Sequence, residues 1–274
     1  MVLFLSRKDV ESVLTMRDAI EAVEKAFGEY ADGTVSMPLR PTIKVPKQSG
    51  SVLFMPAYLE GMNALGIKVV SVYSNNPSKF ALPTIMGVIL LNEPKSGELL
   101  AVMDGAFLTA MRTGAASGVA TKYLARKDVS DIGVIGTGVQ GRKQVAAVCE
   151  VRSIKRVKAF DVDRERCDLF CTEISKELGV QVVGVESARE AVRGSGVVVT
   201  ASTSKTPVVE GAWLEEGTHV NAIGSHTPDA SELDAAAANR AKLVVDSREA
   251  ALKEAGDLMI PIAQGLFSQD HIFA

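Results

Sequence analysis

Three glycines at a fixed spacing constrain the fold of this chain more than any other feature of its sequence. Gly136, Gly138 and Gly141 directly follow the apolar run 132–135 and open a predicted helix, 140–150. In such a strand–turn–helix unit, the first glycine permits the tight turn and the second lets a pyrophosphate approach the backbone. The third lets the helix pack on the strand. The motif therefore predicts a dinucleotide-binding turn, with the phosphates at the start of the helix.

An acidic residue completes this motif. Asp161 lies 20 residues after Gly141, at the end of the next apolar run, 157–160. A carboxylate there accepts hydrogen bonds from the adenine ribose and would repel the 2′-phosphate of NADP, so NAD is the favoured cofactor. Arg164 follows closely and would partly offset this preference. The other residues assigned to the cofactor site are Val139, Gln140, Ala222, Ile223 and Gly224.

The chain after residue 128 alternates between short Val/Ile-rich runs and helical stretches. Helices are predicted over 140–150 and 163–178, and strands over 132–135, 157–160, 180–183, 197–200, 219–223 and 243–245. Continuous apolar runs are typical of parallel strands that are buried on both faces. The fold class predicted for this part is therefore α/β, a Rossmann-type doubly wound parallel sheet.

The first third of the chain predicts a different, mixed α+β unit. Thr15 and Asp18 resemble a capping box, and Gly33 is a stop signal for the helix that follows them. Strands are predicted over 51–55, 65–73, 84–92 and 98–103, the last two joined by a hairpin connection at 93–97. With no helix between them, these strands predict an antiparallel or mixed sheet.

A helix rich in small residues, 104–126, connects the two parts. We predict a substrate-binding and dimerisation domain at 1–118, an NAD(P)-binding domain at 119–257, and the start of a further segment at 258–274.

Composition excludes several classes of function. The 274 residues include 30 Lys+Arg against 33 Asp+Glu, without the basic excess of nucleic-acid binders. The longest apolar stretch, 85–91, is far short of a membrane span, and the N-terminus lacks the order of a signal peptide. Three cysteines and three histidines form no metal motif. We expect a cytoplasmic protein with no nucleic-acid, membrane or metal partner.

Three cations are candidates for holding an anionic substrate. Lys68 interrupts an apolar strand, Arg112 interrupts the small-residue helix, and Arg40 lies in a proline-flanked loop. Each has an ordinary alternative, as a residue that faces solvent, and the pattern alone does not choose between these readings.

Two ionisable groups follow the strand 219–223, at the edge where parallel sheets bind ligands. His226 and Asp229 are candidates for an acid/base beside a nicotinamide. The alternatives are a loop histidine and an N-cap for a helix beginning near Ser231.

Taken together, these residues resemble the ornithine cyclodeaminase/mu-crystallin family along essentially the whole chain. The segments that carry the resemblance are SMPLR at 36–40, LGIK at 65–68, LPT at 82–84, AVMD at 101–104, LTAMRTGA at 108–115, the glycine turn, and EGTHVNAIG at 216–224. The resemblance implies a homodimer that acts with NAD(P) at the α-carbon of a small amino or imino acid. It also implies that Arg40, Lys68 and Arg112 grip the substrate carboxylate, and that Thr84 and Arg112 lie beside the cofactor.

Two departures from the family pattern refine this prediction. Ornithine cyclodeaminases carry an acid/base Asp where this chain has His226, whereas Asp229 resembles the Pro-Asp of mu-crystallin. We therefore expect an alanine dehydrogenase or a ketimine or pyrroline-2-carboxylate reductase, with Lys68 or Asp229 transferring the proton. Ornithine cyclodeaminase is the alternative, and a non-catalytic mu-crystallin-like binder is a third. Family chains also continue past the region 270–274, so we expect the segment that returns to the first domain to be cut short here.

Overall fold

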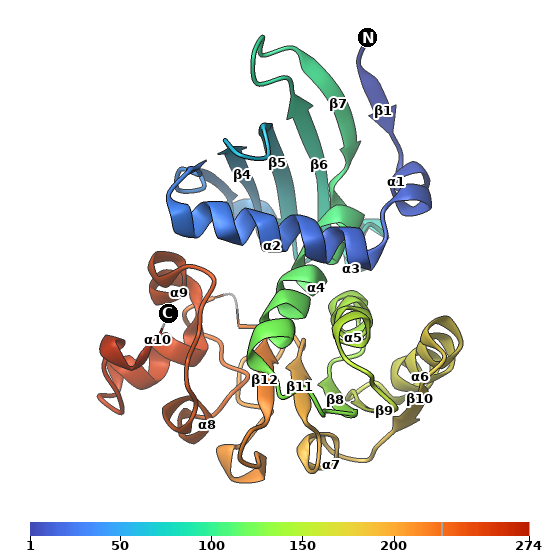
Figure 1. Cartoon of the computed structure of the whole chain (residues 1–274), viewed down its shortest axis with the longest axis vertical. Coiled ribbons are helices and arrows are strands. Elements are labelled where there is room, and N and C mark those ends of the chain that lie inside the picture. Colours follow the sequence, from blue (N-terminus) through green and yellow to red (C-terminus); the bar gives the residue numbers. More distant parts are fainter. Residues whose placement is uncertain (226, 274) are drawn as a thin grey trace. The chain divides into compact units, whose positions relative to one another are not determined.

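The computed structural model describes residues 1–225 and 227–273, and its contacts divide the chain into two units, Met1–Arg112 and Thr113–Ala274 (Figure 1). The division falls inside helix α4 (Gly105–Leu124). The domain boundary predicted after residue 118 falls inside the same helix and stays a prediction.

The second unit is built on a five-stranded parallel sheet. Its strands are β8 (Asp131–Ile135), β9 (Arg156–Phe160), β10 (Gln181–Gly184), β11 (Val197–Thr200) and β12 (His219–Ala222). They run in the order β10-β9-β8-β11-β12, and every neighbouring pair is parallel. The strand order reverses at β8, the strand that precedes the glycine turn.

Helices cover both faces of this sheet. The helices of the second unit are α5 (Val139–Val151), α6 (Arg164–Leu178), α7 (Ala188–Val192), α8 (Ala235–Arg240), α9 (Arg248–Glu254) and α10 (Gly256–Ala263). Val134 and Val199 pack in a buried cluster with residues of α5 and α6, whereas Ile135 and Val198 pack with residues of α7. Alternate residues of a strand face opposite sides of a sheet. The predicted doubly wound fold is therefore confirmed.

One predicted strand of this unit is wrong. Residues 243–245 form only an isolated bridge, between Leu243 and Ile272, because no strand of the sheet lies beside them. Instead, Leu243 and Val245 pack on a small cluster around Ala251, Leu258 and Ile272. The described part of 258–274 thus packs within the second unit, and its predicted return to the first stays a prediction.

The first unit contains a mixed sheet. Its strands are β1 (Leu3–Leu5), β2 (Val35–Ser36), β3 (Thr42–Val45), β4 (Gly50–Leu59), β5 (Ala64–Tyr73), β6 (Ile85–Asn92) and β7 (Leu99–Asp104). Strand β1 pairs parallel with β7, and all other pairs are antiparallel. The hairpin predicted between the last two strands is confirmed by the pairing of β6 with β7. The helices of this unit are α1 (Arg7–Val13), α2 (Met16–Asp32) and α3 (Asn76–Phe80).

The predicted ends of α2 are also confirmed. Thr15 and Asp18 form a capping box, and Gly33 ends the helix with φ of 74°, a left-handed conformation that favours glycine. Small residues let α4 approach its neighbours closely, as expected. A Cβ on Gly114 would lie 2.6 Å from the carbonyl oxygen of Lys143 on α5.

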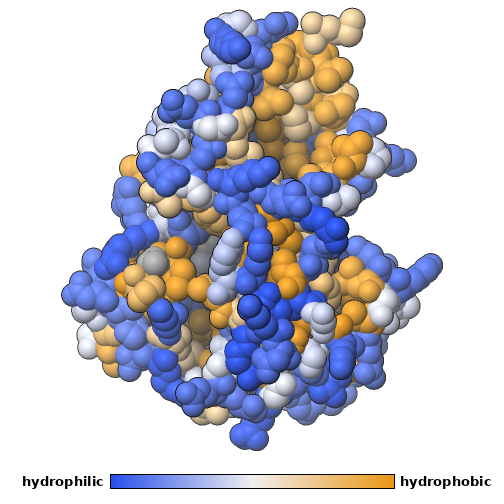
Figure 2. Space-filling view, viewed as in Figure 1, coloured by the Kyte–Doolittle hydropathy of each residue, from blue (hydrophilic) through white to orange (hydrophobic). Residues whose placement is uncertain are grey.

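The sheet of the first unit is far less buried than the sheet of the second. No residue of β4 is fully buried and only Val70 of β5 is, whereas β11 is buried throughout. Figure 2 shows hydrophobic residues gathered on the surface of the first unit. Large apolar side chains exposed there include Phe4, Ile43 and Val88. In the described part of the chain, no helix has the length and apolar character needed to cross a membrane.

Candidate functional site

The glycine turn has the geometry that its sequence predicts. Gly136 has φ of 95°, and a Cβ there would lie 2.5 Å from the carbonyl oxygen of Ala201. A Cβ on Gly141 would collide with the carbonyl oxygen of Gly136, so the third glycine is needed for α5 to start here. The space beside Gly138 is open to 4 Å. Gly138 is also the N-cap of α5 and supplies no side-chain acceptor for the first amides of that helix.

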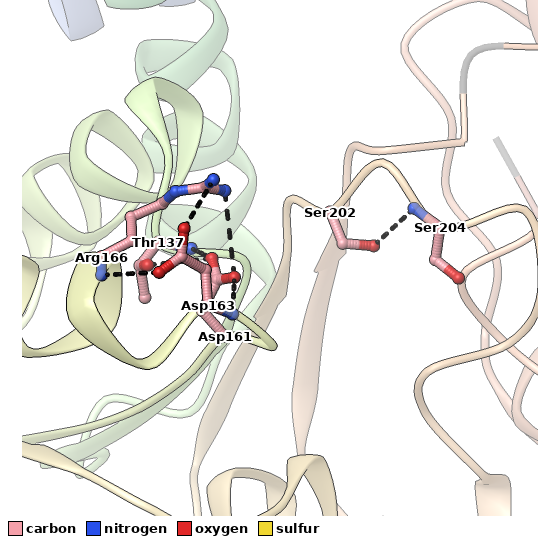
Figure 3. A network of polar contacts seen from close by, with 6 residues as sticks. All are labelled: Thr137, Asp161, Asp163, Arg166, Ser202 and Ser204. Atoms are coloured by element: carbon pink, nitrogen blue, oxygen red, sulfur yellow. Dashed lines mark hydrogen bonds and ion pairs between the residues drawn. The ribbon is translucent and has the colours of Figure 1, made fainter.

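Asp161 lies at the end of β9, where the motif predicts it, and is held by the turn itself (Figure 3). Its Oδ2 accepts hydrogen bonds from the amide of Thr137 at 2.8 Å and from the Thr137 hydroxyl at 2.9 Å. Its Oδ1 accepts one from the amide of Asp163 at 3.0 Å. Burial opposes the charged form, but these hydrogen bonds outweigh it and lower the pKa of Asp161 below its ordinary value. The carboxylate is therefore charged at neutral pH.

The cation beside this carboxylate is not the predicted one. Arg164 pairs with Asp168 at 3.6 Å and with Glu186 at 3.1 Å. Arg166, two residues further along α6, lies 3.9 Å from Asp161 and 3.0 Å from Asp163. Two carboxylates therefore lie within ion-pair distance of Arg166.

These residues fit a dinucleotide. The first amides of α5 lack a side-chain cap, the second glycine leaves open space, and a charged carboxylate ends the next strand. Gln140, in the first turn of α5, has a buried Oε1 that accepts no hydrogen bond from any described residue. A buried polar atom of this kind needs a partner, which a ligand at the turn would supply.

The remaining residues assigned to the cofactor lie where β12 ends. Ala222 is exposed, and Ile223 and Gly224 are partly buried in the loop that follows. The amide of Gly224 donates to Oε2 of Glu232 at 2.8 Å. Sequence reasoning missed Glu232, and it missed Thr137 as the partner of Asp161.

In the first unit, Lys68 lies in an apolar ladder on the sheet. It pairs with Met55 on β4 and with Ile89 on β6, and all three line a groove of about 240 Å³. Because residues paired across strands share a face, Lys68 lies on the same face of the sheet as Met55 and Ile89, and its role in holding a substrate stays a prediction. The groove is otherwise apolar, with Ala57, Leu59 and Leu91 among its walls.

Lys68 is influenced by the charges of the two other predicted cations, Arg112 and Arg40. Burial, and to a smaller extent the charges of Arg112 and Arg40, together lower the pKa of Lys68 to about 7. Arg112 lies on α4 and Arg40 between β2 and β3, and both residues are exposed. Thr84 lies just before β6, where its carbonyl accepts a hydrogen bond from the amide of Tyr73 at 2.8 Å.

The structure describes one of the two acid/base candidates that follow β12. His226 lies outside the described residues. Asp229 is exposed, and a hydrogen bond from Thr227 lowers its pKa below the ordinary value. It is not the N-cap of a helix near Ser231, because α8 begins at Ala235 and is capped by Asp234, whose side chain accepts from the amide of Ala237.

The fold and the turn define a dinucleotide-binding α/β protein whose other unit carries a cluster of cations. The model of the ornithine cyclodeaminase/mu-crystallin family matches residues 2–274, and the chain belongs to that family. An alanine dehydrogenase of Archaeoglobus fulgidus is 41% identical over 272 residues, which cover 99% of this chain and 82% of the relative.

Two solved structures are also similar. The Delta(1)-pyrroline-2-carboxylate reductase of Thermococcus litoralis, in complex with NADH and L-proline, has a TM-score of 0.95 and 50% identity, covering 98% of this chain and 83% of that one. An archaeal alanine dehydrogenase dimer with bound NAD has a TM-score of 0.91 and 39% identity, covering 99% of this chain and 82% of that one.

Proposed function

We propose that this protein is an NAD-dependent oxidoreductase that transfers a hydride at the α-carbon of a small α-amino or α-imino acid. The observation that carries the proposal is the cluster of Lys68, Arg112 and Arg40, on a chain that also has a complete dinucleotide turn. Two relatives with these reactions, an alanine dehydrogenase and a pyrroline-2-carboxylate reductase, support the choice of substrate class.

The cations hold the substrate carboxylate in this proposal. Burial and then the positive charges of Arg112 and Arg40 oppose the charged form of Lys68, and a bound anion would offset the repulsion among the three cations. Charge-assisted hydrogen bonds from guanidinium groups also orient a carboxylate, and hydride transfer needs a fixed α-carbon. A bound nicotinamide supplies or accepts the hydride.

Lys68 is the residue we propose to transfer the proton at the substrate nitrogen. In the empty site, where its pKa is about 7, the amine exchanges a proton readily at neutral pH, and a bound carboxylate then favours the protonated form, which can donate that proton. Asp229 is a weaker candidate, because its lowered pKa keeps it charged and its exposure leaves it in water.

We further propose that NAD is preferred over NADP. The support is the charged carboxylate of Asp161, which would repel a 2′-phosphate, and the sharing of Arg166 between two acids. The neighbouring solved structures hold NADH or NAD.

The proposal also includes a homodimer. The exposed hydrophobic side chains of the first unit, among them Phe4, Ile43 and Val88, are typical of a surface that a second copy covers. The similar archaeal alanine dehydrogenase is a dimer.

The test is the oxidation of NADH and NADPH by the purified chain, followed by absorbance, with pyruvate plus ammonia and with pyrroline-2-carboxylate. We expect turnover with at least one substrate, and faster turnover with NADH. Ammonia released from ornithine without net NADH change would instead indicate a cyclodeaminase. Nucleotide binding without turnover on any of these compounds would indicate a non-catalytic binder.

A further inference from the structure

Glu232 is a fully buried acid that the proposed reaction does not use. Its carboxylate joins two loops. Oε1 accepts a hydrogen bond from the amide of Ser202 at 2.7 Å, and Oε2 accepts one from the amide of Gly224 at 2.8 Å. Ser202 follows β11 and Gly224 follows β12. One side chain therefore ties together the carboxyl ends of two neighbouring strands.

Neighbouring residues accommodate Glu232 and hold it in this position. A Cβ on Gly224 would collide with the carboxyl carbon of Glu232, so only glycine permits the approach. From the other side, Oδ1 of Asp257 accepts hydrogen bonds from the amides of Glu232 at 2.7 Å and Leu233 at 2.9 Å. Asp257 lies in the first turn of α10 and is itself buried. The backbone that carries Glu232 is thus held in place.

Burying an acid here opposes its charged form. Burial raises the pKa of both Glu232 and Asp257 above the ordinary values, although hydrogen bonds from neighbouring groups oppose the shift. An uncharged residue of similar size would avoid this desolvation. What a carboxylate offers in exchange is two acceptor oxygens, one for each loop.

The loops that Glu232 connects follow strands on the opposite side of β8 from Asp161, the residue expected to bind the adenosine half of a dinucleotide. Asp161 ends β9, on one side of β8, and β11 and β12 lie on the other side. A dinucleotide bound at the switch point extends over both sides. The loop after β11 also contacts the glycine turn, because a Cβ on Gly136 would meet Ala201 and Ser202 within 2.9 Å. The Ser202 hydroxyl accepts a hydrogen bond from the amide of Ser204 at 3.2 Å, which shapes the same loop (Figure 3).

We propose that Glu232 is a positioning residue for the nicotinamide half of the cofactor: its carboxylate fixes the loops after β11 and β12 in the arrangement to which that half binds. This inference rests on the proposed function, because it requires a nicotinamide dinucleotide as the ligand. Glu232 touches neither cofactor nor substrate in this role and acts through the backbone of the two loops.

The test compares Glu232→Gln with Glu210→Gln in binding two ligands, NADH and ADP. Glutamine keeps the size of the side chain but has only one acceptor oxygen. Its NH₂ group, a donor, would then meet the backbone N–H of one of the two loops, which is also a donor. We expect the Kd for NADH to rise about tenfold in Glu232→Gln, in line with the loss of a charge-assisted hydrogen bond. The Kd for ADP, which lacks the nicotinamide half, should stay within about twofold. Glu210 is exposed in the preceding loop, so Glu210→Gln removes the same charge and should bind both ligands like the wild type.

Two results for Glu232→Gln would overturn the inference. Unchanged NADH binding by Glu232→Gln would exclude a positioning role, and equal weakening of NADH and ADP with a lowered Tm would indicate a purely structural one. If Glu232→Gln does not fold, Glu232→Asp provides the same comparison, because its carboxylate is one methylene too short to reach both loops. A wild-type chain that binds neither ligand would contradict the proposed function itself, whereas a wild-type chain that binds both leaves only the role of Glu232 at issue.

Discussion

Lys68 has opposite effects on stability and on the proposed catalysis. Its pKa is about 7 in the folded chain and near 10.5 in an unfolded one. Between these values the unfolded state binds more protons, so the contribution of Lys68 to stability rises with pH from about 7 to about 10.5. Below pH 7 the side chain is charged in both states, and its burial beside two guanidinium groups is unfavourable.

Replacing Lys68 by methionine should therefore stabilise the chain and inactivate it. At pH 6 we expect a higher Tm, by roughly 2–4 °C for each kcal/mol relieved, and a difference that shrinks as the pH approaches 10. Turnover should be lost, because the proton donor and one carboxylate contact are gone. Lys44→Met, at an exposed position of β3, should change neither quantity. Near-normal turnover of Lys68→Met would contradict the proposed role of Lys68 in proton transfer and substrate binding.

Asp161 is the residue that we expect to control the choice of cofactor. Asp161→Asn removes the charge that repels a 2′-phosphate and keeps one acceptor oxygen. We expect the Kd for NADH to rise about tenfold and the Kd for NADPH to fall, both followed by cofactor fluorescence. Asp168→Asn, an exposed acid on α6 that pairs with Arg164, is the matched control. Parallel changes for the two cofactors would argue against a charge effect.

The residues that could be predicted are those whose partners are close in sequence or whose spacing is characteristic. Asp161 was predicted because the turn and the next strand fix its distance from Gly141. Glu232 could not be, since one of its partners lies 30 residues away and the link exists only after the sheet has formed. For Lys68 the pattern did not indicate which residues share its face of the sheet, because the pairing with Met55 and Ile89 depends on the register of neighbouring strands.

At the scale of elements, the start of α5 offers the sharpest comparison. Gly141→Ala should destabilise the chain and weaken NADH binding at least tenfold, because the new methyl group collides with the turn at Gly136. Gly28→Ala, in the interior of α2 with open space around it, should instead stabilise by about 0.5–1 kcal/mol. Urea unfolding of the two variants gives the comparison, and similar effects at the two sites would contradict the close approach at Gly141.

Elements with a strong local signal were predicted well, and those that depend on distant partners were not. The capping box of α2 depends on two residues three positions apart, and the run of valines in β11 by itself indicates a buried strand. Residues 243–245 have the composition of a strand, yet a strand needs a neighbour, and they pack on α9 and α10 instead. Short helices such as α7 and α8 have too few turns for a periodic pattern to appear.

At the scale of the whole molecule, the open sheet of the first unit predicts self-association. Ile43→Asp places a charge among the exposed hydrophobic side chains of the first unit and should convert a dimer into a monomer, as measured by sedimentation velocity. Leu169→Asp, at an exposed position of α6 in the other unit, should leave the dimer intact. A monomeric wild-type chain, or a dimeric Ile43→Asp variant, would contradict the proposed interface.

The lowered pKa of Lys68 has a consequence for ligand binding as a whole. At pH 7, the amine of Lys68 is half protonated in the empty site, because its pKa is about 7. A carboxylate bound beside it favours the protonated form, so the binding of such a ligand should take up a proton from the buffer. Calorimetry in two buffers of different ionisation enthalpy should reveal this uptake, and Lys68→Met should abolish it. Above pH 7, each further pH unit should weaken the binding of a carboxylate ligand by nearly tenfold. The concentration of protons would then regulate how well the enzyme competes for its substrate.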